Sequence, residues 1–159
     1  MNNGKVVLYW AAPCFTQAER IWNRLCAEYL RKKGYEVILP QDEANKFLGN
    51  GKQDFGGLAE GCYSQAIGCD AMVDILDGPD PDSGMSMEAG FKIHEIKTGG
   101  KGVTVGVRTD FRVSEDGQLN AMFRLLDDIV FFPSFNESYE QLCDQIDEKI
   151  KTLLKSKQR

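Results

Sequence analysis

Short apolar runs alternate along the chain with longer segments in which apolar residues recur every three or four positions. The short runs predict buried strands, and the longer segments predict amphipathic helices. The expected strands cover residues 6–10, 36–39, 71–76, 103–107 and 129–132. The expected helices cover residues 15–33, 58–67, 83–98, 119–126 and 134–155. Residues 41–57 are polar and glycine-rich without a clear period, so we expect a loop there, placed to cover a site.

This alternation predicts the fold class. Strands with continuous apolar runs, separated by helices, are typical of a parallel sheet covered on both faces. Right-handed crossovers then give a doubly wound, flavodoxin- or Rossmann-like α/β fold with five strands in the order 2-1-3-4-5. The length of 159 residues fits one domain spanning residues 1–159. Ligands of such folds bind beyond the carboxyl ends of the strands, so segments 9–15 and 77–88 are the expected walls of a site.

The charge and composition of the chain limit the classes of partner that we expect it to bind. Lysine and arginine number 19 against 24 aspartates and glutamates, which gives a net charge of −5. The chain shows no basic face, so we expect neither nucleic acid nor a membrane as a partner. No apolar run is long enough for a transmembrane helix or a signal peptide. Five cysteines without a CxxC spacing predict no disulfide framework and a reducing, cytoplasmic compartment.

The candidate chemistry is equally restricted. The chain has a single histidine, His94, and the turn after the first strand holds no glycine. A histidine-rich metal site, a dinucleotide fingerprint and a Walker loop are therefore not expected, and we expect no metal and no cofactor. The chemistry should rest on carboxylates or thiols.

An acidic cluster is the most distinctive feature of the chain. Six acids lie within nineteen consecutive residues: Asp70, Asp74, Asp77, Asp80, Asp82 and Glu88. Composition alone favours a helix N-cap role for Asp82. Asp74 interrupts an apolar strand, so it either faces the mouth of the pocket or pairs with a basic neighbour. Glu88 lies on an apolar helical segment, where a carboxylate needs a partner or a function.

Paired carboxylates point to glycosyl transfer. In retaining enzymes one carboxylate attacks the anomeric carbon, and another manages the proton of the leaving group. The transition state is positively charged, so an acidic pocket stabilises it. The nearby helix N-terminus favours the charged form of Glu88, which suits a nucleophile.

Two segments resemble the nucleoside 2-deoxyribosyltransferase family. Members have a first strand followed by a Tyr-(x)-Ala-(Gly/Ala)-Pro-x-Phe turn, which here is Tyr-Trp-Ala-Ala-Pro-Cys-Phe over residues 9–15. The family also has an aspartate leading into the third strand, then Leu-Asp-Gly, then Asp-x-Gly-x-x-x-Glu-x-Gly. Here these are Asp70, residues 76–78 and residues 82–90. The resemblance covers most of the chain.

The resemblance implies roles for particular residues. Glu88 is expected as the nucleophile that forms a covalent 2-deoxyribosyl-enzyme, Asp82 as a ligand of the sugar hydroxyl, Asp70 as the residue that hydrogen-bonds and protonates the base, and Tyr9 as a phenol near the nucleophile. The expected substrate-binding residues are Ala11, Pro13, Phe15, Gly78, Gly84, Met85 and Asn120. Asn120 would act across a subunit contact, so a homodimer or larger homo-oligomer is expected.

The implied activity moves 2-deoxyribose between purine and pyrimidine bases by double displacement, with deoxynucleosides and free nucleobases as substrates. One alternative is a deoxynucleoside or deoxynucleotide N-glycosidase of the same superfamily, because water can replace the accepting base. The sequence Ala11-Ala12-Pro13 offers no phosphate pocket, which favours nucleosides over nucleotides.

Two further alternatives come from similar folds. Cys14 and Arg20 form a C-x5-R string typical of low-molecular-weight phosphatases, but the loop lacks the glycine that a phosphate cradle favours. A receiver domain needs an acidic pair after the first strand to hold Mg²⁺, and residues 9–12 provide none.

Overall fold

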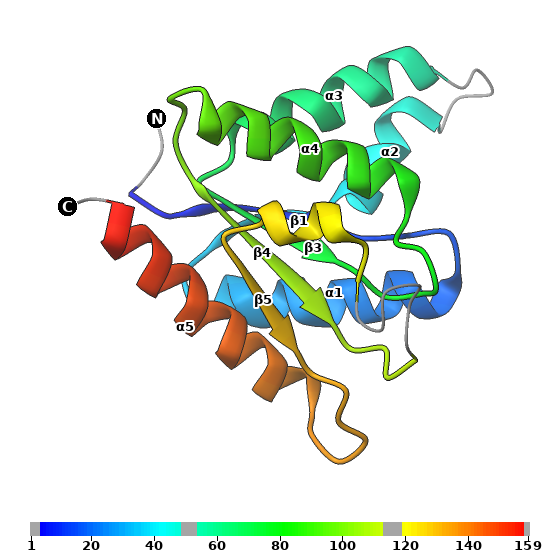
Figure 1. Cartoon of the computed structure of the whole chain (residues 1–159). Helices are drawn as coiled ribbons and strands as arrows, with labels where there is room; N and C mark the ends of the chain where they lie inside the picture. The colour runs from blue at the N-terminus through cyan, green and yellow to red at the C-terminus, as the bar shows by residue number, and fades with distance from the viewer. Residues whose placement is uncertain (1–3, 49–53, 113–118, 158–159) are drawn as a thin grey trace.

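The computed structural model describes residues 4–48, 54–112 and 119–157 (Figure 1). Its strands are β1 (Val7–Ala11), β2 (Glu36–Ile38), β3 (Ala71–Ile75), β4 (Val103–Arg108) and β5 (Asp128–Phe131). Its helices are α1 (Gln17–Lys32), α2 (Pro40–Leu48), α3 (Phe55–Gly68), α4 (Ser83–Lys97), the short 3-10 helix η1 (Ala121–Leu125) and α5 (Tyr139–Lys157). The five strands form one parallel sheet in the order β2-β1-β3-β4-β5, which confirms the predicted fold class.

Helices cover the sheet on both faces. Helices α1 and α5 lie on one side, and α2, α3 and α4 lie on the other (Figure 1). Because side chains alternate along a strand, each central strand contributes to two cores. Leu8, Trp10 and Val73 pack in the core beneath α1 and α5. Tyr9 and Met72 pack in the second core, beneath α3 and α4, together with other apolar residues.

The predicted loop over residues 41–57 is wrong for most of its length. Helix α2 begins at Pro40, and residues 55–57 already belong to α3. Pro40 follows the predicted strand directly, and proline is suited to the first turn of a helix, where its missing N–H is not needed. Asp42 and Glu43 follow in that turn, where they complement the helix dipole. Residues 49–53 lie outside the described residues.

Other boundaries differ less. The predicted helix over 119–126 is the five-residue 3-10 helix η1, and the last helix begins at residue 139 rather than 134. Residues 109–112 are irregular as expected, whereas residues 113–118 of that predicted loop lie outside the described residues. No helix within the described residues is long and apolar enough to cross a membrane.

A buried lysine holds the amino-terminal edge of the sheet together. Lys92 of α4 is fully buried, and its Nζ donates to the carbonyl oxygens of Ile67 at 2.9 Å, Cys69 at 2.6 Å and Lys101 at 3.0 Å. These carbonyls belong to the last turn of α3, to the residue after that helix and to the turn before β4. Gly102 passes close to this lysine with φ +111°, where a Cβ would stand 3.0 Å from Nζ, so glycine is required.

Candidate active site

A glutamate and a tyrosine meet above the middle of the sheet. Asp82 begins α4 as its N-cap, with Oδ1 accepting a hydrogen bond from Met85 N at 2.9 Å. The helix therefore starts at a fixed residue, and Glu88 lies about a turn and a half farther along it. Tyr9 of β1 points to the same side of the sheet and donates from Oη to Glu88 Oε1 at 3.0 Å. The structure thus brings Glu88 and Tyr9 together, as the resemblance implies.

Burial and hydrogen bonding have opposite effects on the pKa of Glu88. Burial raises the pKa of this carboxyl above its ordinary value, and the charge of Asp82 adds to the increase. Hydrogen bonding by Tyr9 and by Cys62 lowers the pKa because it stabilises the carboxylate. Glu88 is only half-buried, so a ligand can reach it. A partly desolvated carboxylate with fixed donors suits nucleophilic attack on an electron-poor carbon.

Cys62 is a site residue that the sequence analysis missed. It lies on α3, and its thiol is beside both Tyr9 and Glu88. Burial raises the pKa of Cys62, and the charge of Glu88 raises it further, so the group stays a neutral thiol that can donate to the carboxylate. Nothing in its sequence spacing pointed to Glu88, because the contact joins α3 to a helix more than twenty residues farther along the chain.

The thiol alternative is opposed by the geometry. Arg20 Nη1 donates to the carbonyl oxygens of Cys14 at 3.0 Å and Phe15 at 2.7 Å, so the guanidinium is engaged by the backbone of its own loop. Burial, followed by the charge of Asp82, raises the pKa of Cys14. A phosphatase nucleophile needs the opposite shift, because the thiolate is the reactive form.

Replacing Tyr9 by phenylalanine should slow turnover about 10- to 100-fold, the loss expected for one hydrogen bond to a charged group. The acid limb of kcat/KM should also move to higher pH, because the phenol that lowers the pKa of Glu88 is gone. A pH–rate profile measures both effects. Tyr35→Phe is the matched control, since Tyr35 Oη donates to Asp147 Oδ1 at 2.7 Å under the other face of the sheet. A Tyr9→Phe profile that superimposes on the wild-type profile would contradict this role.

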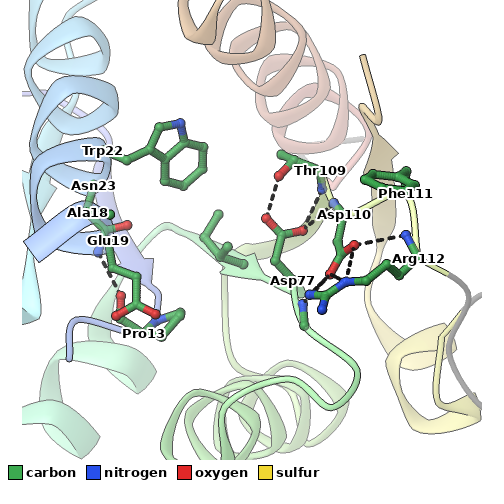
Figure 2. A pocket seen from close by; sticks show the side chains of 12 residues that line it. Pro13, Ala18, Glu19, Trp22, Asn23, Asp77, Thr109, Asp110, Phe111 and Arg112 are labelled. Atoms are coloured by element: carbon green, nitrogen blue, oxygen red, sulfur yellow. Dashed lines mark hydrogen bonds and ion pairs between the residues drawn. The ribbon is translucent and has the colours of Figure 1, made fainter. Parts of the chain in front are cut away.

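Hydrogen bonds fix the loop between β3 and α4 to the end of β4. Arg108 is buried and donates to the carbonyl oxygens of Leu76 and Gly78, the latter at 2.8 Å. Asp77 accepts from Thr109 N at 2.6 Å and Asp110 N at 2.9 Å (Figure 2). Gly78 has φ +101°, a conformation that favours glycine, and its N–H donates to Asp110. This network fixes the loop that leads into α4, the helix that carries Glu88.

A cavity of about 670 Å³ opens beside this loop (Figure 2). Its walls include Pro13, Trp22, Asp77, Gly78, Phe111 and Arg112. It lies at the predicted carboxyl edge of the sheet, toward α1, whereas Tyr9 and Glu88 belong to the α4 side. Its volume is in the range of small-molecule pockets. Of the expected substrate-binding residues, Pro13 and Gly78 line it.

The structure separates Asp70 from this group. Asp70 precedes β3, so it lies at the amino-terminal edge of the parallel sheet, whereas Asp82 follows β3 at the opposite edge. Its Oδ2 accepts from Val7 N at 2.8 Å, at the start of β1. The structure therefore does not bring the Asp70 carboxyl to the contact between Tyr9 and Glu88. The role expected for Asp70 comes from the resemblance, and the buried strand β3 separates Asp70 from Asp82 along the chain.

The remaining expected residues differ in accessibility. Ala11 and Met85 are buried in the core beneath α4, so their side chains support the site rather than face a ligand. Phe15 is 73% exposed at the loop after β1. Gly84 lies in the first turn of α4, where a Cβ would approach Asp82 Oδ1 to 3.2 Å. Asn120 is exposed and caps η1 through Met122 N at 3.0 Å.

The described residues contain no cluster of metal-ligating side chains. Among the residues that the structure describes, no group of three or more histidine, cysteine, aspartate or glutamate side chains is arranged to hold a metal ion.

Comparison with known proteins supplies the family. The family model described as nucleoside 2-deoxyribosyltransferase matches residues 8–122, which include Tyr9, Asp82 and Glu88. The chain belongs to the nucleoside 2-deoxyribosyltransferase family. No curated protein matches this deoxyribosyltransferase family member at the sequence level.

Solved structures show the same fold. A conserved protein from Enterococcus faecalis is 23% identical with a TM-score of 0.70, covering 91% of this chain and 99% of its own. A 2-deoxyribosyltransferase from Bacillus psychrosaccharolyticus is 17% identical with a TM-score of 0.64, covering 86% and 89%. The CMP N-glycosidase BcmB from Clostridium botulinum is 14% identical with a TM-score of 0.61, covering 90% and 98%. The deoxyribosyltransferase fold therefore accommodates both transfer and N-glycoside cleavage.

Proposed function

We propose that this family member transfers 2-deoxyribose between nucleobases through a covalent ester on Glu88. The observation that supports this most is the contact between Tyr9 Oη and Glu88 Oε1, which holds a half-buried carboxylate at the second turn of α4. A fixed, partly desolvated carboxylate is what attack at an anomeric carbon requires.

The proposed reaction has two displacements. Glu88 attacks C1′ of a deoxynucleoside, the C1′–N bond breaks, and the base leaves with the bonding electron pair and takes up a proton. A ring nitrogen of a second base then attacks C1′, releases the Glu88 carboxylate and loses its proton. Each displacement inverts C1′, so the configuration is retained overall. Asp82, whose Oδ1 caps α4, is assigned to the sugar hydroxyl through its second oxygen.

Hydrolysis is the second candidate function. Water in place of the accepting base would release free 2-deoxyribose from the same intermediate. The CMP N-glycosidase with this fold favours keeping this candidate. The two functions differ only in the acceptor, so kinetics must separate them.

An exchange assay separates them. Deoxyinosine and adenine are incubated with the enzyme, and deoxyadenosine, hypoxanthine and free deoxyribose are measured by chromatography. Transfer is expected to give deoxyadenosine in proportion to added adenine. Deoxyribose without deoxyadenosine would assign the chain to hydrolysis, and the absence of both products over a panel of deoxynucleosides would contradict the proposal.

The proposal includes a homodimer or larger assembly in which Asn120 reaches the neighbouring site. Exposed apolar side chains support it: Met87 and Phe91 on α4, and Met122 and Leu125 on η1. Met122 and Leu125 line an apolar hollow between α4 and η1, the helix that Asn120 caps. Light scattering after size-exclusion chromatography tests the assembly, and a monomer with full activity would contradict it.

A cytoplasmic location is also part of the proposal. All five cysteines are unpaired, as expected in a reducing compartment.

A further inference from the structure

Asp74 is a buried carboxyl group that the proposed reaction does not use. It lies in β3 on the same face as Met72 and Leu76, which pack in the core beneath α4. It is fully buried, and neither of its oxygens has a hydrogen-bond partner among the described residues. The sequence analysis expected it at the pocket mouth or paired with a basic residue, and the structure shows neither.

Small neighbours leave room for this side chain. In the sheet register Asp74 lies opposite Ala11 of β1 and opposite Gly106 of β4. Leu76 covers Gly106 so closely that a Cβ there would stand 2.7 Å from Leu76 Cδ1. The carboxyl group is therefore enclosed by apolar atoms, where an unpaired charge is costly.

Among the described residues, no cation neutralises Asp74. Lys92 of α4 donates to three carbonyl oxygens, and Arg108 of β4 donates to the carbonyls of Leu76, Gly78 and Arg112. The other polar groups around this core also have partners: Tyr9 donates to Glu88, Thr104 bonds to Asp127, and the Cys69 thiol donates to Ala66 O.

The charged group that acts on Asp74 is Glu88. Burial raises the pKa of Asp74 well above its ordinary value, and the negative charge of Glu88 raises it further. Asp74 lies on the face of the sheet that packs beneath α4, and Tyr9, which donates to Glu88, belongs to the same core. A charge on Asp74 would therefore be a second buried negative charge beneath the helix that carries Glu88.

We propose that the buried, unpartnered Asp74 holds its proton at neutral pH, so that the negative charge beneath α4 is on Glu88. This inference rests on the proposed function, in which Glu88 is the nucleophile. Asp74 acts through Glu88 and is a positioning residue. When Asp74 loses its proton in alkali, a second buried charge repels the Glu88 carboxylate from its place beside Tyr9. Activity then falls although Glu88 itself remains ionised.

Infrared spectroscopy of the whole protein tests where the proton is. At neutral pH the wild type is expected to show the carbonyl band of a protonated carboxylic acid, absent in Asp74→Asn and retained in Glu88→Gln. Loss of the band in Glu88→Gln instead, or no band in the wild type, would overturn the proposal. This readout needs no substrate, so its failure is distinct from a failure of the proposed function.

Denaturant unfolding across pH gives a second test. The unfolded chain releases the Asp74 proton near an ordinary pKa of about 3.9, while the native protein keeps it. Relative to Asp74→Asn, the wild-type unfolding equilibrium constant should therefore increase by up to about tenfold per pH unit above about pH 4. If Asp74→Asn does not fold, Asp74→Ala replaces it in every test, because its smaller side chain fits between Ala11 and Gly106. If the ratio of the wild-type unfolding constant to that of the Asp74 variant did not change with pH, the proposal would be overturned.

The pH–rate profile completes the test. The wild type should lose kcat/KM at alkaline pH, and Asp74→Asn should retain it there, with both proteins sharing the acid limb set by Glu88. An unchanged alkaline limb in Asp74→Asn would overturn the positioning role. If Glu88→Gln remained active while the infrared result held, the proposed nucleophile would be wrong and the proton assignment would still stand.

Discussion

Replacing Glu88 by glutamine is expected to lower the rate of base exchange by about a thousandfold or more, because an amide cannot form the sugar ester. Glutamine keeps the size of the side chain and its contact with Tyr9. It also removes a carboxyl whose pKa burial raises, so the free energy of unfolding at neutral pH should not decrease. Initial rates of deoxyadenosine formation measure the first effect, and urea unfolding measures the second.

Glu95→Gln is the matched control. Glu95 lies about two turns farther along α4, away from Tyr9. Its replacement by glutamine removes the same charge as Glu88→Gln does. It should retain the wild-type rate. If Glu88→Gln exchanged bases at a rate near that of Glu95→Gln, Glu88 would not be the nucleophile, and the proposed covalent route would be excluded.

Replacing Lys92 by methionine is expected to reduce the free energy of unfolding by about 2–4 kcal/mol, one of the larger single effects in a domain of this size. Methionine fills the volume of the lysine stem but leaves three carbonyl oxygens without their common donor. Each unsatisfied buried acceptor costs about 1–3 kcal/mol, offset in part because a charge no longer has to be buried. Urea unfolding followed by circular dichroism measures the difference.

Lys97→Met on the same helix is the control, since Lys97 is exposed. It should change the free energy of unfolding by less than about 0.5 kcal/mol. Equal stabilities for the two variants would mean that the three carbonyls do not depend on Lys92.

The sequence was sufficient for elements with strong periodicity. Residues 71–76, interrupted by Asp74, and residues 103–107 are short runs of mostly apolar residues, and both form strands inside the sheet within a residue of the predicted ends. Helix α2 was missed because its first residue, Pro40, fits a strand end as well as a helix start. Local signals of this kind are ambiguous until tertiary packing selects one of them.

The site was predictable only in part. The motif around residues 82–90 led to Glu88, and the first strand led to Tyr9. The role expected for Asp70 came from the resemblance, and the structure places its carboxyl on Val7 N at the amino-terminal edge of the sheet. Cys62 and the burial of Asp74 depend on contacts between distant segments, which one sequence does not record.

Mass spectrometry of the acid-quenched enzyme tests the covalent role of Glu88 most directly. The enzyme is mixed with deoxyinosine without an acceptor base, quenched, digested and mapped. One 2-deoxyribosyl group is expected on the peptide that contains Glu88, and it should disappear when adenine is added before quenching. A label on another side chain, or continued exchange with no labelled peptide at any quench time, would contradict the covalent mechanism.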